Sequence, residues 1–298
     1  QEKVYSSNLC SEITLPTNED TSFVCCLSSL NLSLYDEWKD TDTIEIALLF
    51  LNSVMDCFID DSKSIDGLVK ARRFAEKYRA LGLGVLGWHS YLQSKMIGFE
   101  EFEARTQNGL IFKDLHNKGE IFKSKYPVFN NYKLFAIAPT FSNSLISSHS
   151  SPGIEPIAAN HYQINAAKGS FLYKNRYLKK LLKEKNKNTL EVWHDILANE
   201  GSVQQLDFLD EHEKNVFKTA REINQMTVIE HAAQRVKYID QAESLNLYFP
   251  ENAPLNYINE CHYIAWQYGI KTLYYCRTAS ALKGKAAIDF STCKSCEG

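Results

Sequence analysis

The stretch Tyr5-Ser-Ser-Asn-Leu-Cys-Ser-Glu-Ile-Thr14 places a thiol between an amide and a carboxylate. Read as a strand, it would put Asn8, Cys10 and Glu12 on one face, because side chains alternate in an extended chain. The thiol would then have a base and a hydrogen-bond donor close by. A core strand with an incidental cysteine is the competing interpretation. The stretch alone therefore leaves a catalytic thiol and a structural one both open.

The composition is that of a globular protein without a strong net charge. The sequence has 298 residues, of which 44% are apolar, and this is enough for a sizeable buried core. Lys and Arg number 33 against 36 Asp and Glu, which gives a formal charge of -3 without a basic stripe. Attraction to polynucleotide phosphates would therefore be weak, and we do not expect nucleic acid as a partner.

No segment of the sequence reads as a membrane anchor or a secretion signal. The longest apolar stretch, residues 44–54, is interrupted by Glu45 and is too short to span a bilayer. We therefore expect a cytoplasmic protein without membrane contact. In that reducing compartment its eight cysteines would be core thiols, metal ligands or redox catalysts. Because the sequence begins with Gln1 and not Met, we also expect it to be a piece of a longer protein.

Hydrophobic periodicity predicts an α/β fold in which helices alternate with strands that pair in parallel. A short buried strand at 133–139 is followed by a polar loop at 140–151, and such loops often carry the sites of α/β proteins. We expect one folded domain over residues 1–278 and a mobile tail over 279–298. The other predicted strands are 244–249 and 270–275, and the predicted helices are 43–59, 69–81, 102–122, 190–198, 211–224, 227–239 and 255–268.

The glycine-rich stretch Gly82-Leu-Gly-Val-Leu-Gly87 has the G-x-G-x-x-G spacing of a dinucleotide-binding loop. Such a loop needs a strand directly before its first glycine. Residues 71–80 are instead helical in composition and charge, which argues against a dinucleotide-binding fold.

A polar stretch, Pro139-Thr-Phe-Ser-Asn-Ser144, follows the strand predicted at 133–139. Its hydroxyls, its amide and its backbone N–H groups could cradle a phosphate, especially at the start of a helix. A plain surface loop fits the composition equally well, so residue types alone do not decide between the two.

Three further groups of residues have both a redox interpretation and an ordinary one. Cys25 and Cys26 are adjacent, and disulfide geometry disfavours a bond between neighbours. Tyr274-Tyr275 would ordinarily be aromatic core residues of a strand. Cys293-Lys-Ser-Cys296 has the spacing of half a zinc site or of a redox dithiol. No second pair of ligands accompanies it, so we expect thiol exchange there and no metal in the chain.

Together these motifs resemble the class I ribonucleotide reductase large subunit, over a region from Tyr5 to Cys296. Asn-Leu-Cys-x-Glu-Ile at 8–13 is similar to the finger loop of that family, Leu-Gly-x-Gly-Val at 81–85 to a segment of closely packed glycines, and Leu-Tyr-Tyr at 273–275 to its radical-relay motif. The resemblance implies the second half of a ten-stranded α/β barrel, with the finger loop and surrounding helices.

The resemblance also implies a role for each residue of the substrate site. Cys10 would carry a transient thiyl radical that removes the ribose 3′ hydrogen, while Glu12 acts as the base at the 3′-OH and Asn8 positions the ribose. Cys25, and not Cys26, matches one of the two cysteines that reduce the 2′ carbon, and its partner would lie upstream of this sequence. The substrate diphosphate would bind at Thr140, Phe141, Ser142, Asn143 and Ser144, where Phe141 could contribute only its backbone.

The same resemblance implies the partners of the chain. Tyr274 and Tyr275 would relay the radical from the metal-tyrosyl cofactor of a small subunit, since a tyrosine can lose an electron and a proton together. Cys293 and Cys296 would re-reduce the buried disulfide and in turn be reduced by thioredoxin or glutaredoxin. The chain itself would bind a ribonucleotide but no cofactor, and it would need the N-terminal half of the large subunit.

Two other functions are compatible with the sequence. The chain could be a non-catalytic fragment that only completes a barrel supplied by another polypeptide, and it would then bind that partner with or without Cys10. It could also be a thiol-disulfide oxidoreductase that uses Cys293 and Cys296, and it would then reduce disulfides without a nucleotide.

Overall fold

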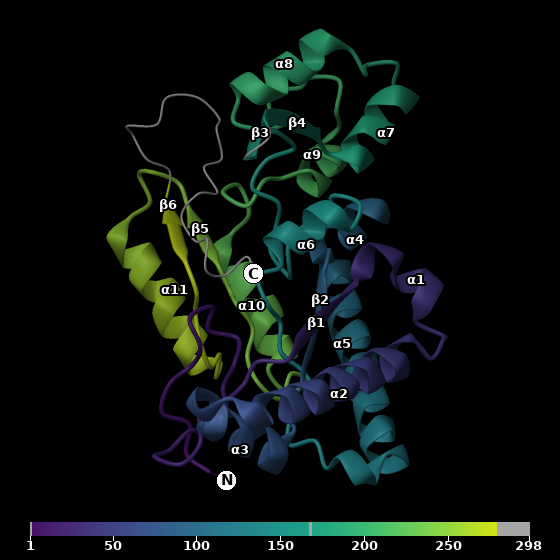
Figure 1. The fold of residues 1–298 in the computed structure, drawn as a ribbon. Coiled ribbons are helices and arrows are strands. Elements are labelled where there is room, and N and C mark those ends of the chain that lie inside the picture. The colour runs from purple at the N-terminus through teal and green to yellow at the C-terminus, as the bar shows by residue number, and fades with distance from the viewer. Residues whose placement is uncertain (1, 167–168, 279–298) are drawn as a thin grey trace.

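A computed structural model describes residues 2–166 and 169–278 (Figure 1). The fold is mixed α/β, with short strands and longer helices. The helices are α1 (Tyr35–Trp38), α2 (Thr43–Asp61), α3 (Val69–Tyr78), α4 (Trp88–Ser94), α5 (Phe102–Lys125), α6 (Phe141–Ile146), α7 (Arg176–Glu184), α8 (Leu190–Ala198), α9 (Glu211–Val216), α10 (Gln225–Arg235) and α11 (Leu255–Gln267). The strands are β1 (Leu27–Asn31), β2 (Gly82–Leu86), β3 (His161–Ala166), β4 (Gly169–Lys174), β5 (Leu247–Phe249) and β6 (Cys276–Thr278).

Extended segments that are far apart in the sequence lie side by side in space and run parallel. β1 pairs with β2, and β2 is bridged in turn to the next segment at Leu83 and Phe135. The segment that contains Phe135 and Ile137 is bridged to a further segment, at Ile137 and Glu243. This further segment continues into β5, which pairs with β6. The expectation of parallel strands separated by helices is therefore confirmed for this part of the chain.

The glycine-rich stretch is itself a strand, because Gly82 to Leu86 form β2. A Cβ atom added at Gly84 would lie 2.3 Å from the carbonyl oxygen of Ala136, and one at Gly82 would lie 2.3 Å from Cδ2 of Leu27. Glycine is needed at position 84, where the clash would be with backbone, and at position 82 it leaves room for the side chain of Leu27. The stretch therefore serves packing and forms no phosphate-binding loop.

The main core lies between these strands and the helices α2, α5, α10 and α11. Apolar side chains at helical spacing on α2, such as Leu48 and Leu51, face Leu83 and Val85 of the central strand region, and all four are at most 1% exposed. Within the described residues, no helix is both long enough and apolar enough to cross a membrane.

Residues 160–166 and 169–217 form a lobe with a core of its own, seen at the top of Figure 1. It contains the antiparallel pair β3 and β4 with α7, α8 and α9. Asn175, at the start of α7, donates from Nδ2 to Oε1 of Gln93 (2.9 Å) and to Oδ1 of Asn160 (2.8 Å), all three in buried surroundings. This polar chain ties the lobe to α4. Neither the β3–β4 pair nor α7 was expected from the sequence.

The strand predicted at 133–139 is reduced to isolated bridges. The carboxylate of Asp240 accepts the backbone N–H groups of Leu134 and Phe135 at 2.8 Å each. These amides therefore bond to a side chain in place of a neighbouring strand, and the ladder does not extend over them. The helix predicted at 211–224 is also too long. It ends at Val216, after which the backbone N–H of Ala220 bonds to the carbonyl of Ile157.

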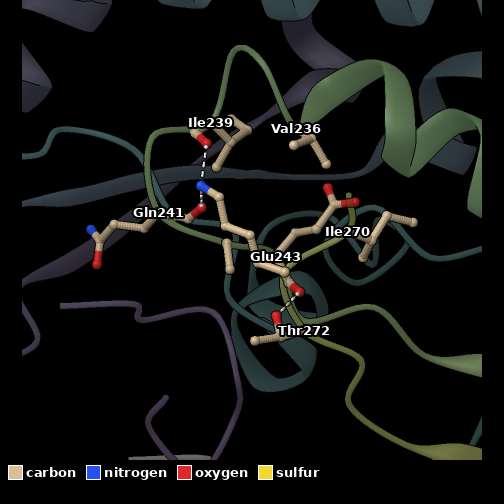
Figure 2. A pocket seen from close by; sticks show the side chains of 8 residues that line it. Val236, Ile239, Gln241, Glu243, Ile270 and Thr272 are labelled. Atoms are coloured by element: carbon tan, nitrogen blue, oxygen red, sulfur yellow. Dashed lines mark hydrogen bonds between the residues drawn. The ribbon is translucent and has the colours of Figure 1, made fainter. Parts of the chain in front are cut away.

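The strand predicted at 270–275 is wrong over its whole length, since β6 begins only at Cys276. The reason is a set of hydrogen bonds from two side chains of this segment to backbone carbonyls, which we call the side-chain clamp. Nζ of Lys271 donates to the carbonyls of Ile239 (3.3 Å) and Asp240 (3.1 Å), and Oγ1 of Thr272 reaches that of Glu243 at 3.5 Å. Figure 2 shows the residues around this clamp, which enclose a pocket with room for about one water molecule. The pocket is too small for a nucleotide.

Candidate functional site

The finger loop, residues 8–13, is a turn and not the strand that the sequence suggested. Ser11 has a φ of 68°, and its N–H bonds to the carbonyl of Asn8 at 3.1 Å. Oδ1 of Asn8 accepts the backbone N–H of Ile13 (3.0 Å), which closes the loop. The turn then brings Nδ2 of Asn8 to 2.9 Å from Oε2 of Glu12. Chain reversal, and not alternation along a strand, therefore places the amide beside the carboxylate.

Ser244 fixes the finger loop from the opposite segment. Its hydroxyl donates to the carbonyl of Cys10 at 2.5 Å and lies 3.2 Å from Oε2 of Glu12. The carbonyl of Glu12 also accepts the N–H of Ala242 (2.9 Å). Cys10, Glu12 and Ser244 are all buried. The thiol and the carboxylate are therefore held rigidly and away from bulk water.

Ser244 was not predicted as a site residue, although the sequence around it contains a pattern that points to it. Residues 244–249, Ser-Leu-Asn-Leu-Tyr-Phe, alternate polar and apolar side chains within a segment that is buried throughout. Ser244, Asn246 and Tyr248 thus share one face of an extended chain. In the structure each of them hydrogen-bonds to a buried glutamate, Glu12 in the first case and Glu155 in the other two. Alternating polar and apolar side chains in a fully buried segment therefore indicate that one face of the segment lines a polar interior.

Tyr274 lies directly beside Cys10, although 264 positions separate the two residues. Its hydroxyl donates to Sγ of Cys10 at 3.9 Å. The rings of Tyr274 and Tyr275 have centroids 4.0 Å apart and planes inclined by 37°. The backbone N–H of Tyr274 bonds to the carbonyl of Leu245 at 2.9 Å. Two tyrosines and a thiol therefore form one continuous series of contacts.

The adjacent cysteines point to different surroundings. Sγ of Cys26 is buried and lies 3.5 Å from the carbonyl of Leu51 in α2, so this thiol belongs to the core. Cys25 is exposed at its surface, yet partial desolvation raises the pKa of its thiol to about 11, and the neighbouring Glu12 and Cys26 add to the rise. Cys25 is thus within electrostatic reach of the finger loop. It keeps its proton at neutral pH.

The candidate phosphate-binding residues form a short helix where a loop was expected. Phe141 to Ile146 are α6, preceded by Thr140 with a φ of 54°. Oγ1 of Thr140 accepts the N–H of Gly153 (2.8 Å), and the buried hydroxyl of Ser144 donates to the carbonyl of Phe141 (2.6 Å). Both hydroxyls are therefore engaged within the protein. The side chains of Ser142 and Asn143 are more open to solvent.

The intrahelical bonds of α6 begin with the N–H of Ser144, which donates to the carbonyl of Thr140 at 2.9 Å. The amides that precede it point out of the start of the helix, where an anion would meet them.

The remaining cysteine motif, Cys293 and Cys296, lies outside the described residues. Within residues 2–166 and 169–278, no group of three or more His, Cys, Asp or Glu side chains is placed to hold a metal ion.

Comparison with known proteins identifies the family of the chain. The family described as "Ribonucleotide reductase, barrel domain" matches residues 1–119 and 122–276. The chain is 44% identical over 286 residues to the ribonucleoside-diphosphate reductase large subunit of Invertebrate iridescent virus 6, and 39% identical over 295 residues to that of Invertebrate iridescent virus 3. These alignments cover 90% and 94% of this chain but only 30% and 46% of the relatives.

A solved structure is similar as well. The Actinobacillus ureae class Id ribonucleotide reductase alpha subunit superimposes with a TM-score of 0.88 at 46% identity, over 93% of this chain and 54% of that one. The sequence thus spans about half or less of the length of each of these proteins. Family match, structural match and the ordered motifs agree, and the chain belongs to the barrel-domain family of ribonucleotide reductase large subunits.

Proposed function

We propose that this chain supplies the radical-bearing part of a class I ribonucleotide reductase, which converts ribonucleotides, as diphosphates, to 2′-deoxyribonucleotides. The observation that carries the proposal is the hydroxyl of Tyr274 at 3.9 Å from Sγ of Cys10. A tyrosine that only packs in the core does not require a buried thiol beside its hydroxyl. A radical relay needs this arrangement, because the electron and the proton must pass between the same two atoms.

The contacts support a sequence of balanced steps. A phenoxyl radical at Tyr274 takes the hydrogen atom of the Cys10 thiol, so that an O–H bond forms, the S–H bond breaks and the unpaired electron moves to sulfur. The thiyl then removes the ribose 3′ hydrogen. Glu12 accepts the 3′-OH proton, and Asn8, already hydrogen-bonded to Glu12, positions the sugar. Burial of Cys10 supports this assignment, because a thiyl radical must be kept from water and from other thiols.

Reduction at the 2′ carbon would use Cys25 together with a cysteine of the other half of the barrel. Two thiols give two electrons and two protons, the 2′-OH leaves as water, a disulfide forms, and Cys10 returns the hydrogen to the 3′ carbon. A thiol that stays protonated suits this task, in agreement with the raised pKa of Cys25. Cys293 and Cys296 would then reduce the disulfide and pass the oxidation on to thioredoxin or glutaredoxin.

The substrate diphosphate would bind at the start of α6. The proposed ligands are backbone N–H groups of Phe141, Ser142 and Asn143, with the side chains of the last two. The hydroxyls of Thr140 and Ser144 would shape the turn, because each already has a partner within the protein.

The proposed assembly contains three kinds of polypeptide. This chain would form the second half of a ten-stranded barrel with the N-terminal half of the large subunit, and a small subunit would supply the radical from its metal-tyrosyl cofactor. Such an enzyme would work in the cytoplasm. Residues 279–298 would be its redox tail.

Reconstitution tests this function. The chain is mixed with a polypeptide that carries the remaining large-subunit residues, with the matching small subunit and with thioredoxin, and deoxyribonucleotide is measured. We expect product only when all of them are present, because the chain alone lacks half of the barrel and one reducing cysteine. Product formed by the chain and the small subunit alone would contradict the proposal, and so would nucleotide-independent disulfide reduction as the sole activity.

A further inference from the structure

A second buried glutamate, Glu155, lies outside the steps described above. It belongs to the stretch Gly153-Ile-Glu-Pro156 that follows α6, and it is 5% exposed. Its Oε1 accepts Nδ2 of Asn246 at 2.6 Å, and its Oε2 accepts the hydroxyl of Tyr248 at 2.5 Å. Both donors come from the segment next to β6. A buried carboxylate with two short hydrogen bonds is a rigid anchor point.

Two contacts connect this anchor to the outer tyrosine of the relay. Oδ1 of Asn246, whose amide nitrogen is bound to Glu155, accepts the backbone N–H of Tyr275 at 2.9 Å. The guanidinium of Arg277 lies 4.6 Å from the centre of the Tyr275 ring, and its positive charge acts on Glu155. Glu155 is therefore linked by hydrogen bonds through Asn246 to the backbone of Tyr275, and it feels the charge of the cation that packs against the Tyr275 ring.

The two tyrosines are held differently. Tyr274 is fixed by its hydroxyl at Cys10 and by the carbonyl of Leu245. The backbone N–H of Tyr275 bonds instead to Asn246, which Glu155 holds, and its ring packs against Arg277. Loss of the Glu155 carboxylate should therefore disturb Tyr275 more than Tyr274.

From these contacts we propose that Glu155 is a positioning residue that aligns Tyr275, and that it links the segment after the substrate-binding helix to the radical relay. The part of this inference that concerns radical relay rests on the proposed function. The alignment of Tyr275 does not, since it follows from the Glu155–Asn246–Tyr275 hydrogen bonds and the Arg277 contact.

The ionisation of Glu155 provides a readout in solution. Burial raises the pKa of its carboxyl group to about 7, partly offset by Tyr248, Arg277 and Asn246. The titratable groups that face it are Tyr248 and Arg277, and burial keeps the Tyr248 hydroxyl protonated by raising its pKa well above 10. A change near neutral pH that is felt at the Tyr275 ring can thus be assigned to Glu155.

The test uses the full chain with 4-fluorophenylalanine at position 275, a ring that has no titrating hydroxyl. We expect its fluorine NMR resonance to shift with a midpoint near pH 7, and we expect Glu155→Gln to move the resonance and remove this step. Tyr248→Phe, which deletes only one hydrogen bond to the carboxylate, should move it less in the same direction. The control is Glu213→Gln, since Glu213 is also buried but bonds to Asp210 and Lys185 in the lobe.

In the reconstituted enzyme with Tyr275 intact, Glu155→Gln should lower kcat about tenfold with little change in KM, because a charge-assisted hydrogen bond that holds the relay is lost. An unchanged resonance and pH step in Glu155→Gln would overturn the inference, whether or not the assembly reduces nucleotides. An unchanged kcat would overturn the link to radical relay. Failure of the wild-type assembly would instead count against the proposed function, because the fluorine measurement needs no turnover.

Discussion

Replacing Cys10 with serine is expected to abolish nucleotide reduction in the reconstituted enzyme while substrate still binds. The oxygen of serine is smaller than sulfur, and its O–H bond is too strong to give up a hydrogen atom to a phenoxyl radical. Each added 1.4 kcal/mol of barrier costs a factor of ten, so we expect a loss of more than about 10⁴-fold. Turnover and nucleotide affinity are measured on the same preparation.

Cys57→Ser provides the matched control for this substitution. Cys57 is an exposed free cysteine on α2, and its replacement should leave turnover near the wild-type value. Substantial product from Cys10→Ser would remove Cys10 from its role as radical carrier. Loss of both turnover and nucleotide binding would indicate instead that Cys10 only supports the fold of the finger loop.

Tyr274→Phe is the second substitution for which we expect a very large effect. Phenylalanine keeps the ring and its stacking on Tyr275 but removes the hydroxyl that contacts Sγ of Cys10. The free energy of unfolding should fall by only about 1 kcal/mol, the usual cost of one hydrogen bond. Turnover should fall by more than about 10³-fold, because no proton and electron can leave this position together. The two effects differ enough in size to separate a relay from a core role.

Tyr35→Phe is the control for Tyr274→Phe. Tyr35 is also partly buried, and its hydroxyl donates to Asp114 at 3.4 Å. It should show a similar small loss of stability and nearly full turnover. If Tyr274→Phe behaved in the same way, the tyrosine pair would be ordinary packing residues and the class I assignment would lose its main support.

The helices were predictable from the sequence because their signal is local. Apolar residues at helical spacing define the buried faces of α2 and α5, and both elements lie where periodicity placed them, as do α8 and α11. Parallel strands carry no such signal, since their partners lie far away in the chain. The glycines of β2 were therefore noticed as a motif but not as a strand. Their spacing makes sense only beside Ala136 and Leu27.

The candidate site was only partly predictable for the same reason. The finger loop was identified by its residues, but its turn depends on a positive φ at Ser11, which is not a glycine and gave no warning. The proximity of Tyr274 to Cys10 follows from no spacing rule, and it was expected only through resemblance to a family. Ser244 and Glu155 were missed because their partners come from distant segments. Buried polar alternation in 244–249 was the one usable sign.

The central claim is that Tyr274 passes the radical to Cys10, and the most direct measurement replaces Tyr274 with 3-aminotyrosine, which is easier to oxidise than tyrosine and retains the radical. The assembled enzyme is mixed with ribonucleoside diphosphate and followed by electron paramagnetic resonance. We predict that an aminotyrosyl radical appears at position 274 as the small-subunit radical disappears in equal amount, and that Cys10→Ser leaves its formation intact. A small-subunit radical that persists unchanged, with no new signal at position 274, would contradict the account.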